Sequence, residues 1–162
     1  MAEVLDVSSL LPNRFEPKRK NRWVLQIEGV DAFLLKTASR PTVTTEEIEM
    51  PFVNSVRYLA AKTRFNTINI VLQDGIAPSG AQQVMEWQRL CMESVSGRAG
   101  YADFYKRDIQ LKMVDPVGTV VELWDIKGAF IRSVNFGELS YDDHAAMEIQ
   151  LEIRYDNAVL QY

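Results

Sequence analysis

The fold of this chain is decided by the stretch from Met147 to Tyr155, which reads Met-Glu-Ile-Gln-Leu-Glu-Ile-Arg-Tyr. Apolar residues occupy every second position, and charged or polar residues fill the positions between them. Successive side chains of a β-strand point to opposite faces of its sheet, so the stretch predicts a strand with one apolar and one polar face. Such a strand is typical of an antiparallel sheet that packs on a core from one side only.

Length and composition limit the class of protein. The chain has 162 residues, of which 47% are hydrophobic and 25% charged, and this suits one domain with a sizeable core. No apolar run approaches the roughly 20 residues that span a bilayer, and residues 1–11 lack the pattern of a signal peptide. We therefore expect no membrane anchor and synthesis in the cytosol. The single cysteine, Cys91, excludes an intramolecular disulfide.

Three segments follow from the distribution of periodic stretches. We expect an N-terminal arm over residues 1–21, a β domain over residues 22–156 and a C-terminal tail over residues 157–162. The domain is predicted to be mainly β, an antiparallel β-sandwich or barrel with one flanking α-helix. Ser79 and Gln82 match a capping box, which predicts that this helix begins near Gly80.

Alternation and turn residues predict the remaining strands. They are expected at residues 22–28 and 32–36, forming a hairpin, and then at 43–50, 65–73, 108–114, 119–127, 129–136 and 147–155. Pro51 is expected to end the 43–50 strand. Residues 52–64 follow neither a strand nor a helix period, and a long segment of this kind is more often functional or interfacial than idle.

No group of residues predicts catalysis. A P-loop, a G-x-S-x-G elbow, a dinucleotide fingerprint and a C-x-x-C pair are all absent from the sequence. Asp142-Asp143-His144 is better explained as a turn than as a metal site, because three adjacent residues do not readily point at one ion. Glu148 and Glu152 share a strand face but lack the apolar pocket of a glycosidase acid pair. We predict no enzyme, no metal and no cofactor.

The arm is basic, whereas the chain as a whole carries a net charge of −4. One interpretation is that the arm contacts nucleic acid or an acidic neighbouring surface, through Arg14, Lys18, Arg19 and Lys20. The other is that it is a solvated segment before the first strand. The acidic remainder of the chain argues against tight binding of nucleic acid.

Six short segments occur in a characteristic order: Arg22–Ile27, Lys36–Pro41 before Pro51-Phe52, Arg64–Ile70, Glu86–Gln88, Ile126–Phe130 and Gly137–Leu139. Each segment is too short and degenerate to identify a family by itself, so the evidence lies in their shared order and spacing. Together, over residues 22–155, they resemble the tail tube protein of contractile-tailed bacteriophages.

The resemblance implies a structural subunit of the virion tail, made in the host cytoplasm. In that family six copies form a ring around a channel, and rings stack into a tube inside a contractile sheath. The implied partners are further copies of the chain, the sheath protein, the tape-measure protein, the baseplate, the tail terminator, and DNA that passes without specific binding. Two alternatives stay open: a tube subunit of a related injection or type VI-like secretion machine, and a small-ligand-binding β-barrel module with an internal pocket.

Two sets of residues are assigned by combining the pattern with the resemblance. Exposed-face positions expected to line the channel, or alternatively to face outer solvent, are Thr67, Asn69, Glu148, Gln150 and Glu152. The segment from Met50 to Arg64 resembles the part that reaches an adjacent ring. Its expected contacts between subunits and rings, with local core packing as the alternative, are Phe52, Val53, Val56, Arg57, Tyr58 and Leu59. The basic arm could dock on an acidic neighbour or meet the sheath.

Overall fold

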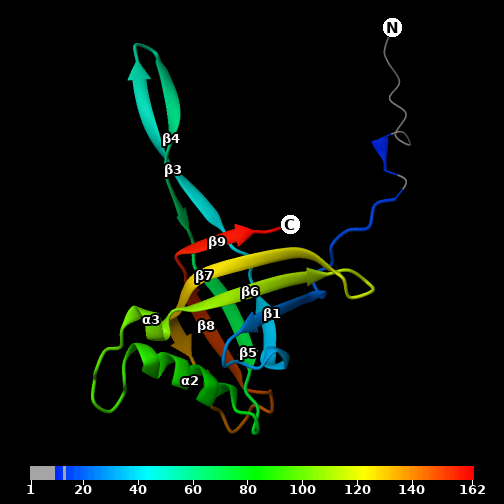
Figure 1. Cartoon of the computed structure of the whole chain (residues 1–162), viewed down its shortest axis with the longest axis vertical. Coiled ribbons are helices and arrows are strands. Elements are labelled where there is room, and N and C mark those ends of the chain that lie inside the picture. The colour runs from blue at the N-terminus through cyan, green and yellow to red at the C-terminus, as the bar shows by residue number, and fades with distance from the viewer. Residues whose placement is uncertain (1–9, 13) are drawn as a thin grey trace.

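Strand β8 (Glu148–Arg154) lies inside a seven-stranded antiparallel sheet, between β7 (Val120–Asn135) and β5 (Ile68–Gln73) (Figure 1). Its apolar residues are buried, and the residues between them are exposed or half-buried. The predicted two-faced strand is therefore confirmed. The computed structural model describes residues 10–12 and 14–162.

The sheet forms two layers because β7 belongs to both of them. The first half of β7 pairs with β6 (Arg107–Val114) and with β9 (Asn157–Leu160), and β6 pairs with β1 (Trp23–Ile27). The second half pairs with β8, and the layer continues through β5 to β2 (Leu35–Ala38). Between the halves, Gly128 has a φ of +66°, which glycine adopts without steric strain. The mainly β sandwich is confirmed, but the sheet does not close into a barrel within the described residues.

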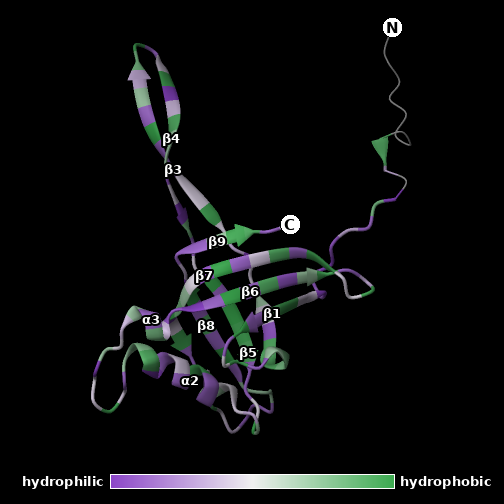
Figure 2. Ribbon diagram, in the orientation of Figure 1, coloured by the Kyte–Doolittle hydropathy of each residue, from purple (hydrophilic) through white to green (hydrophobic). Residues whose placement is uncertain are grey.

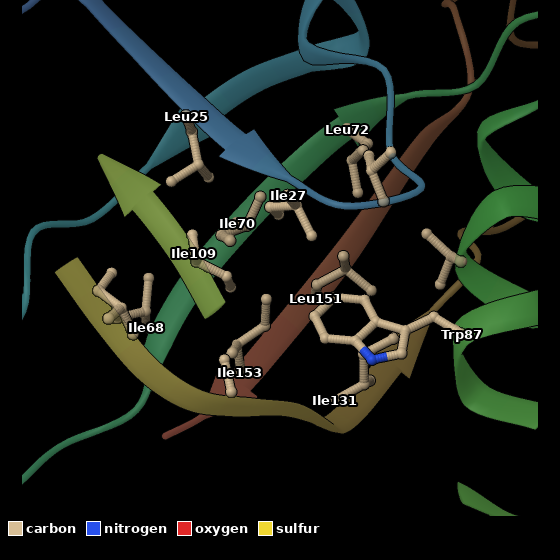
Figure 3. Close-up of a cluster of buried hydrophobic side chains, with 14 of the residues drawn as sticks. Leu25, Ile27, Ile68, Ile70, Leu72, Trp87, Ile109, Ile131, Leu151 and Ile153 are labelled. Atoms are coloured by element: carbon tan, nitrogen blue, oxygen red, sulfur yellow. The ribbon is translucent and has the colours of Figure 1, made fainter. Parts of the chain in front are cut away.

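The core fills the space between the two layers (Figure 3). Ile27 and Ile109 from one layer face Ile70 and Ile153 from the other, and each of these side chains is at most 5% exposed. The packed interior is unlike that of a carrier, which needs an internal cavity for its ligand. Among the described residues, buried apolar side chains fill the space between the layers in which that alternative would place its ligand.

Helix α2 (Gly80–Cys91) packs against the core through Trp87, whose side chain is 1% exposed. The indole Nε1 of Trp87 donates a hydrogen bond of 2.8 Å to the carbonyl oxygen of the last residue of α3 (Ala102–Tyr105). The predicted helix start is confirmed, because the Ser79 hydroxyl accepts the backbone N–H of Gln82. The short helix α3 was not predicted.

The predicted hairpin between residues 22–28 and 32–36 is wrong. β1 pairs with β6 and β2 pairs with β5, in different layers. The single-turn 3-10 helix η1 (Ala32–Leu34) connects β1 to β2, and Leu34 is buried. Turn residues near Gly29 indicated a change of direction, but they could not indicate which strand each segment joins.

Two other expectations differ from the observed strands. The separate strands predicted at 119–127 and 129–136 are one continuous strand, β7, because Gly128 bends the backbone without ending the pairing. The segment over residues 157–162, which we set apart as a tail, contains β9 and pairs with β7.

Replacing Leu72 by alanine tests the packing of the core. Leu72 is 0% exposed, so the Leu72→Ala variant should lose about 2–5 kcal/mol of unfolding free energy through lost transfer energy and a residual cavity. Urea denaturation followed by tryptophan fluorescence measures this loss. Val71→Ala, a half-buried neighbour on the opposite face, is the control and should lose much less. Equal losses in the two variants would contradict the assignment of the core face.

Candidate functional site

A hairpin of β3 (Val43–Phe52) and β4 (Ser55–Phe65) projects away from the sandwich (Figure 1). Every residue of β3 is exposed, and only Ala61 and Phe65 of β4 are half-buried. Pro51 does not end β3, contrary to our prediction, because a strand at a sheet edge tolerates the missing N–H of proline. Within the described residues, no core lies beneath the outer part of this hairpin.

Both faces of the hairpin carry apolar side chains, and Figure 2 shows hydrophobic residues along both strands. The pairs on one face are Ile48 with Leu59, Met50 with Arg57 and Phe52 with Ser55, and those on the other are Glu49 with Tyr58 and Pro51 with Val56. This two-sided distribution explains why the sequence followed no clean period there. We call residues 50–59 the hairpin tip. It contains all six predicted assembly residues: Phe52, Val53, Val56, Arg57, Tyr58 and Leu59.

The five residues predicted to line a channel share one face of the β5–β8 layer, opposite to the core. Cross-strand pairs place Asn69 beside Glu152, and they place Gln150 and Glu148 further along the same strand. Thr67, just before β5, donates a hydrogen bond of 2.9 Å from its hydroxyl to Glu152. We call this group the polar face: Thr67, Asn69, Glu148, Gln150 and Glu152.

Cations of the same subunit balance the acids of the polar face. Arg132 Nη1 lies 2.7 Å from Glu152 Oε1, and Lys36 pairs with Glu148. The surface is therefore polar without a dense cluster of either charge. Such a face binds phosphate weakly, because phosphate binding depends on cations that are free to replace counterions.

The basic arm is held to the sandwich by Glu122, a buried carboxylate on β7 that our sequence analysis missed. Glu122 is 5% exposed and pairs with Lys18 of the arm and with Arg40, 3.5 Å away. Trp124 Nε1 donates to Glu122 at 2.6 Å. Glu122 has the same strand parity as Ile126, which points into the core, and this parity was the signal that could have found it.

The surroundings of Glu122 favour its charged form. Burial by itself raises the pKa of this carboxyl, but the hydrogen bonds from Lys18 and Trp124, with the charges of Lys18 and Arg40, lower the pKa below its ordinary value. The other predicted arm residues are less constrained. Arg19 lies 3.7 Å from Glu16, and Arg14 and Lys20 form no ion pair with any described residue.

No group of three or more metal-ligating residues gathers among the residues that the structure describes. Asp143 accepts the N–H of Ala145 at 2.9 Å, as the predicted turn requires, and Cys91 is a half-buried free thiol. Among residues 10–12 and 14–162, no helix has the length and apolarity to cross a bilayer.

The described residues form a two-layer β-sandwich from which a hairpin with exposed apolar side chains projects. The family of the T4-like virus tail tube protein gp19 matches residues 19–159. The chain therefore belongs to this tail tube family. It is a structural subunit of a contractile tail tube and a component of the virion, and it is not an enzyme.

Similar proteins agree with this membership. The tail tube protein of Serratia phage KSP90 is 29% identical in an alignment 158 positions long, which covers 88% of this chain and 88% of that protein. The fold is similar to a chain in the anti-feeding prophage cap, with a TM-score of 0.75, 14% identity and coverage of 97% of this chain and 99% of that one. It is also similar to a chain in the extended sheath–tube complex of an extracellular contractile injection system, PVC, with a TM-score of 0.67, 17% identity and coverage of 98% and 99%.

Replacing Glu122 by glutamine tests the anchoring of the arm. The Glu122→Gln variant loses the carboxylate charge, so trypsin at neutral pH should cleave after Lys18 faster, and unfolding free energy should fall by about 1–3 kcal/mol. Because the pKa of Glu122 is lowered in the folded protein, this stabilisation is present above the unfolded pKa of about 4.3 and is lost as pH falls through the folded value. Glu138→Gln, an exposed site, is the control. Unchanged cleavage in Glu122→Gln would contradict the anchor.

Proposed function

We propose that this tail tube subunit forms hexameric rings, that the rings stack through the hairpin, and that the stack encloses a channel for DNA ejection. The observation that carries the proposal is the uncovered hairpin tip, where Phe52 is 76% and Val53 is 88% exposed. Exposed apolar groups of this extent mark sites of protein association. An isolated two-stranded hairpin is also marginally stable in water, so its extension away from the sandwich implies a covering partner.

Stacking would bury the tip against other copies of the chain. Each large apolar side chain that becomes fully buried contributes about 1.5–3 kcal/mol, and the tip offers several. The tip projects from one end of the molecule (Figure 1), and in a stack of rings that all point the same way it would meet a different surface of the next copy. Contacts of this heterologous kind, when they do not close, generate a filament, as a tube requires.

Ring formation would use the edges of the sheet. Among the described strands β2 pairs only with β5, and β1 pairs only with β6, so each leaves one edge for a neighbouring copy. Unpaired strand edges readily accept strands from other chains. A neighbour added at β2 would continue the β5–β8 layer around an axis and turn the polar face toward the channel.

The polar face suits a conduit for DNA. Its acids are paired with cations of the same subunit, so few free cations would hold a passing phosphate backbone. The net charge of −4 adds a weak repulsion over the whole subunit. DNA would then move through the channel without specific binding.

Further partners follow from the place of the subunit in a tail. We assign the outer surface of the tube to the sheath protein, the channel to the tape-measure protein before ejection, and the ends to the baseplate and the tail terminator. The basic arm, with Arg14 and Lys20 unpaired among the described residues, is a contact for an acidic surface on the sheath or a neighbouring copy. Synthesis takes place in the host cytoplasm before assembly.

The alternative role, a tube subunit of an injection machine, uses the same fold, as the chains of the anti-feeding prophage and of PVC show. The two functions differ in cargo. Particles purified from producing cells distinguish them, because a phage tail joins a DNA-filled head, whereas an injection machine carries no genome.

Replacing Tyr58 and Leu59 by aspartate tests stacking. Two buried carboxylates without partners are strongly unfavourable at an apolar contact, so the double variant should stay folded but fail to form tubes. Sedimentation and negative-stain microscopy would then show small particles or single rings. Val117→Asp, which adds a charge at another exposed valine, is the control and should polymerise. Full-length polymers from the Tyr58→Asp, Leu59→Asp variant would contradict the proposed contact.

Labelling of a cysteine at Asn69 tests the direction of the polar face. In a Cys91→Ser background, Asn69→Cys in assembled tubes should react with a small maleimide but not with a polyethylene-glycol maleimide too bulky to enter the channel. The same variant, unassembled, should react with both reagents. Rapid labelling of intact tubes by the bulky reagent would place Asn69 on the outer surface instead.

A further inference from the structure

The hairpin tip combines apolar side chains with one unpaired charge. Arg57 is the only charged residue between positions 50 and 59, and it forms no ion pair with any residue that the structure describes. At the turn itself, Val53 has a φ of +51° and is 88% exposed. A positive φ is an unfavourable backbone conformation for a β-branched residue such as valine. The exposed apolar side chain of Val53 suits a contact with another protein surface.

The opposite end of the molecule carries a surface of complementary chemistry. Residues 137–147, which we call the acidic loop, connect β7 to β8 at the end away from the hairpin (Figure 1). Leu139 is 86% exposed in this loop. Three exposed carboxylates accompany it, and none forms an ion pair within the described chain: Glu138, Asp142 and Asp143.

Two neighbouring clefts make this end concave. One, of about 520 Å³, is lined by residues of the acidic loop together with Glu148 and Gln150. The other, of about 500 Å³, lies between α2 and the residue after β7, and is lined by Ala81, Gln82, Met85, Glu86, Arg89 and Phe136. Phe136 and Gly137 are adjacent in the chain, so the two clefts lie next to each other.

We propose that the two clefts beside the acidic loop receive the hairpin tip of a second copy in the next ring, with Arg57 of the tip facing the carboxylates of the loop. The inference rests on the proposed tube function and adds the receiving surface. The tip cannot reach the loop of its own subunit, because the two lie at opposite ends of the molecule (Figure 1). An apolar tip with one cation matches an acidic rim with exposed apolar residues, and such charge complementarity fixes the register of an interface.

Reciprocal charge reversal tests the pairing. Arg57→Glu should raise the protein concentration needed for tube formation by about tenfold or more, because like charges then face each other. Asp142→Arg with Asp143→Arg should do the same. The variant that carries all three substitutions should recover tubes, since opposite charges face each other again. Lys62→Glu, which changes charge on the same hairpin outside the tip, is the matched control and should assemble normally.

Cross-linking between two single-cysteine chains gives a second readout that does not depend on polymer yield. In a Cys91→Ser background, chains with Val53→Cys mixed with chains with Leu139→Cys and treated with a copper–phenanthroline oxidant should form disulfide-linked dimers when they assemble and should remain monomeric when diluted. Circular dichroism of every variant verifies folding.

The outcomes separate this inference from the proposed function. Recovery by the triple variant, with dimers from the mixed cysteines, supports the receiving surface. If wild-type protein forms tubes but the acidic-loop reversal leaves them unchanged, the tip has another occupant, such as a neighbouring hairpin, and the inference is overturned while the tube function stands. If wild-type protein forms no tubes under any condition, the proposed function itself fails.

Discussion

The hairpin of β3 and β4 imposes the constraint on which the rest of this account depends, because it has no core of its own. Nearly all of its residues are exposed, and both of its faces carry exposed apolar side chains. Two strands alone cannot bury enough surface to offset the conformational entropy of ordering them. We therefore propose that a surface outside the chain completes the hairpin, in keeping with the tail tube family to which the chain belongs.

The sandwich, in contrast, is complete within one subunit. Its two layers enclose an aliphatic core, and α2 adds Trp87 to that core. Because one chain supplies all the residues of this core, we expect each subunit to fold before it assembles. Among the described residues, the open margins include the outer edges of β1, β2 and β9, the hairpin tip and the loop after β7. Those margins lie on different sides of the sandwich, which would allow one set of contacts within a ring and another between rings.

How far the sequence could predict this structure depended on how local each signal was. β8 and the start of α2 were predicted correctly because alternation and a capping box are properties of adjacent residues. The partners of β1 and β2 were missed because pairing is decided by long-range packing. The role of Glu122 was missed because its partners lie far away in the chain. The residues of the hairpin tip and of the polar face were chosen by combining pattern with family resemblance, and the structure brings each set together.

The central claim is that the exposed margins of the subunit are completed by identical copies around a hollow axis. Negative-stain microscopy of the purified wild-type protein over a range of concentrations measures this most directly. The account predicts rings at intermediate concentration and hollow stacked tubes at high concentration. Discrete monomers at every concentration, with the hairpin still protected from proteases, would contradict it, because the hairpin would then be stable without any covering partner.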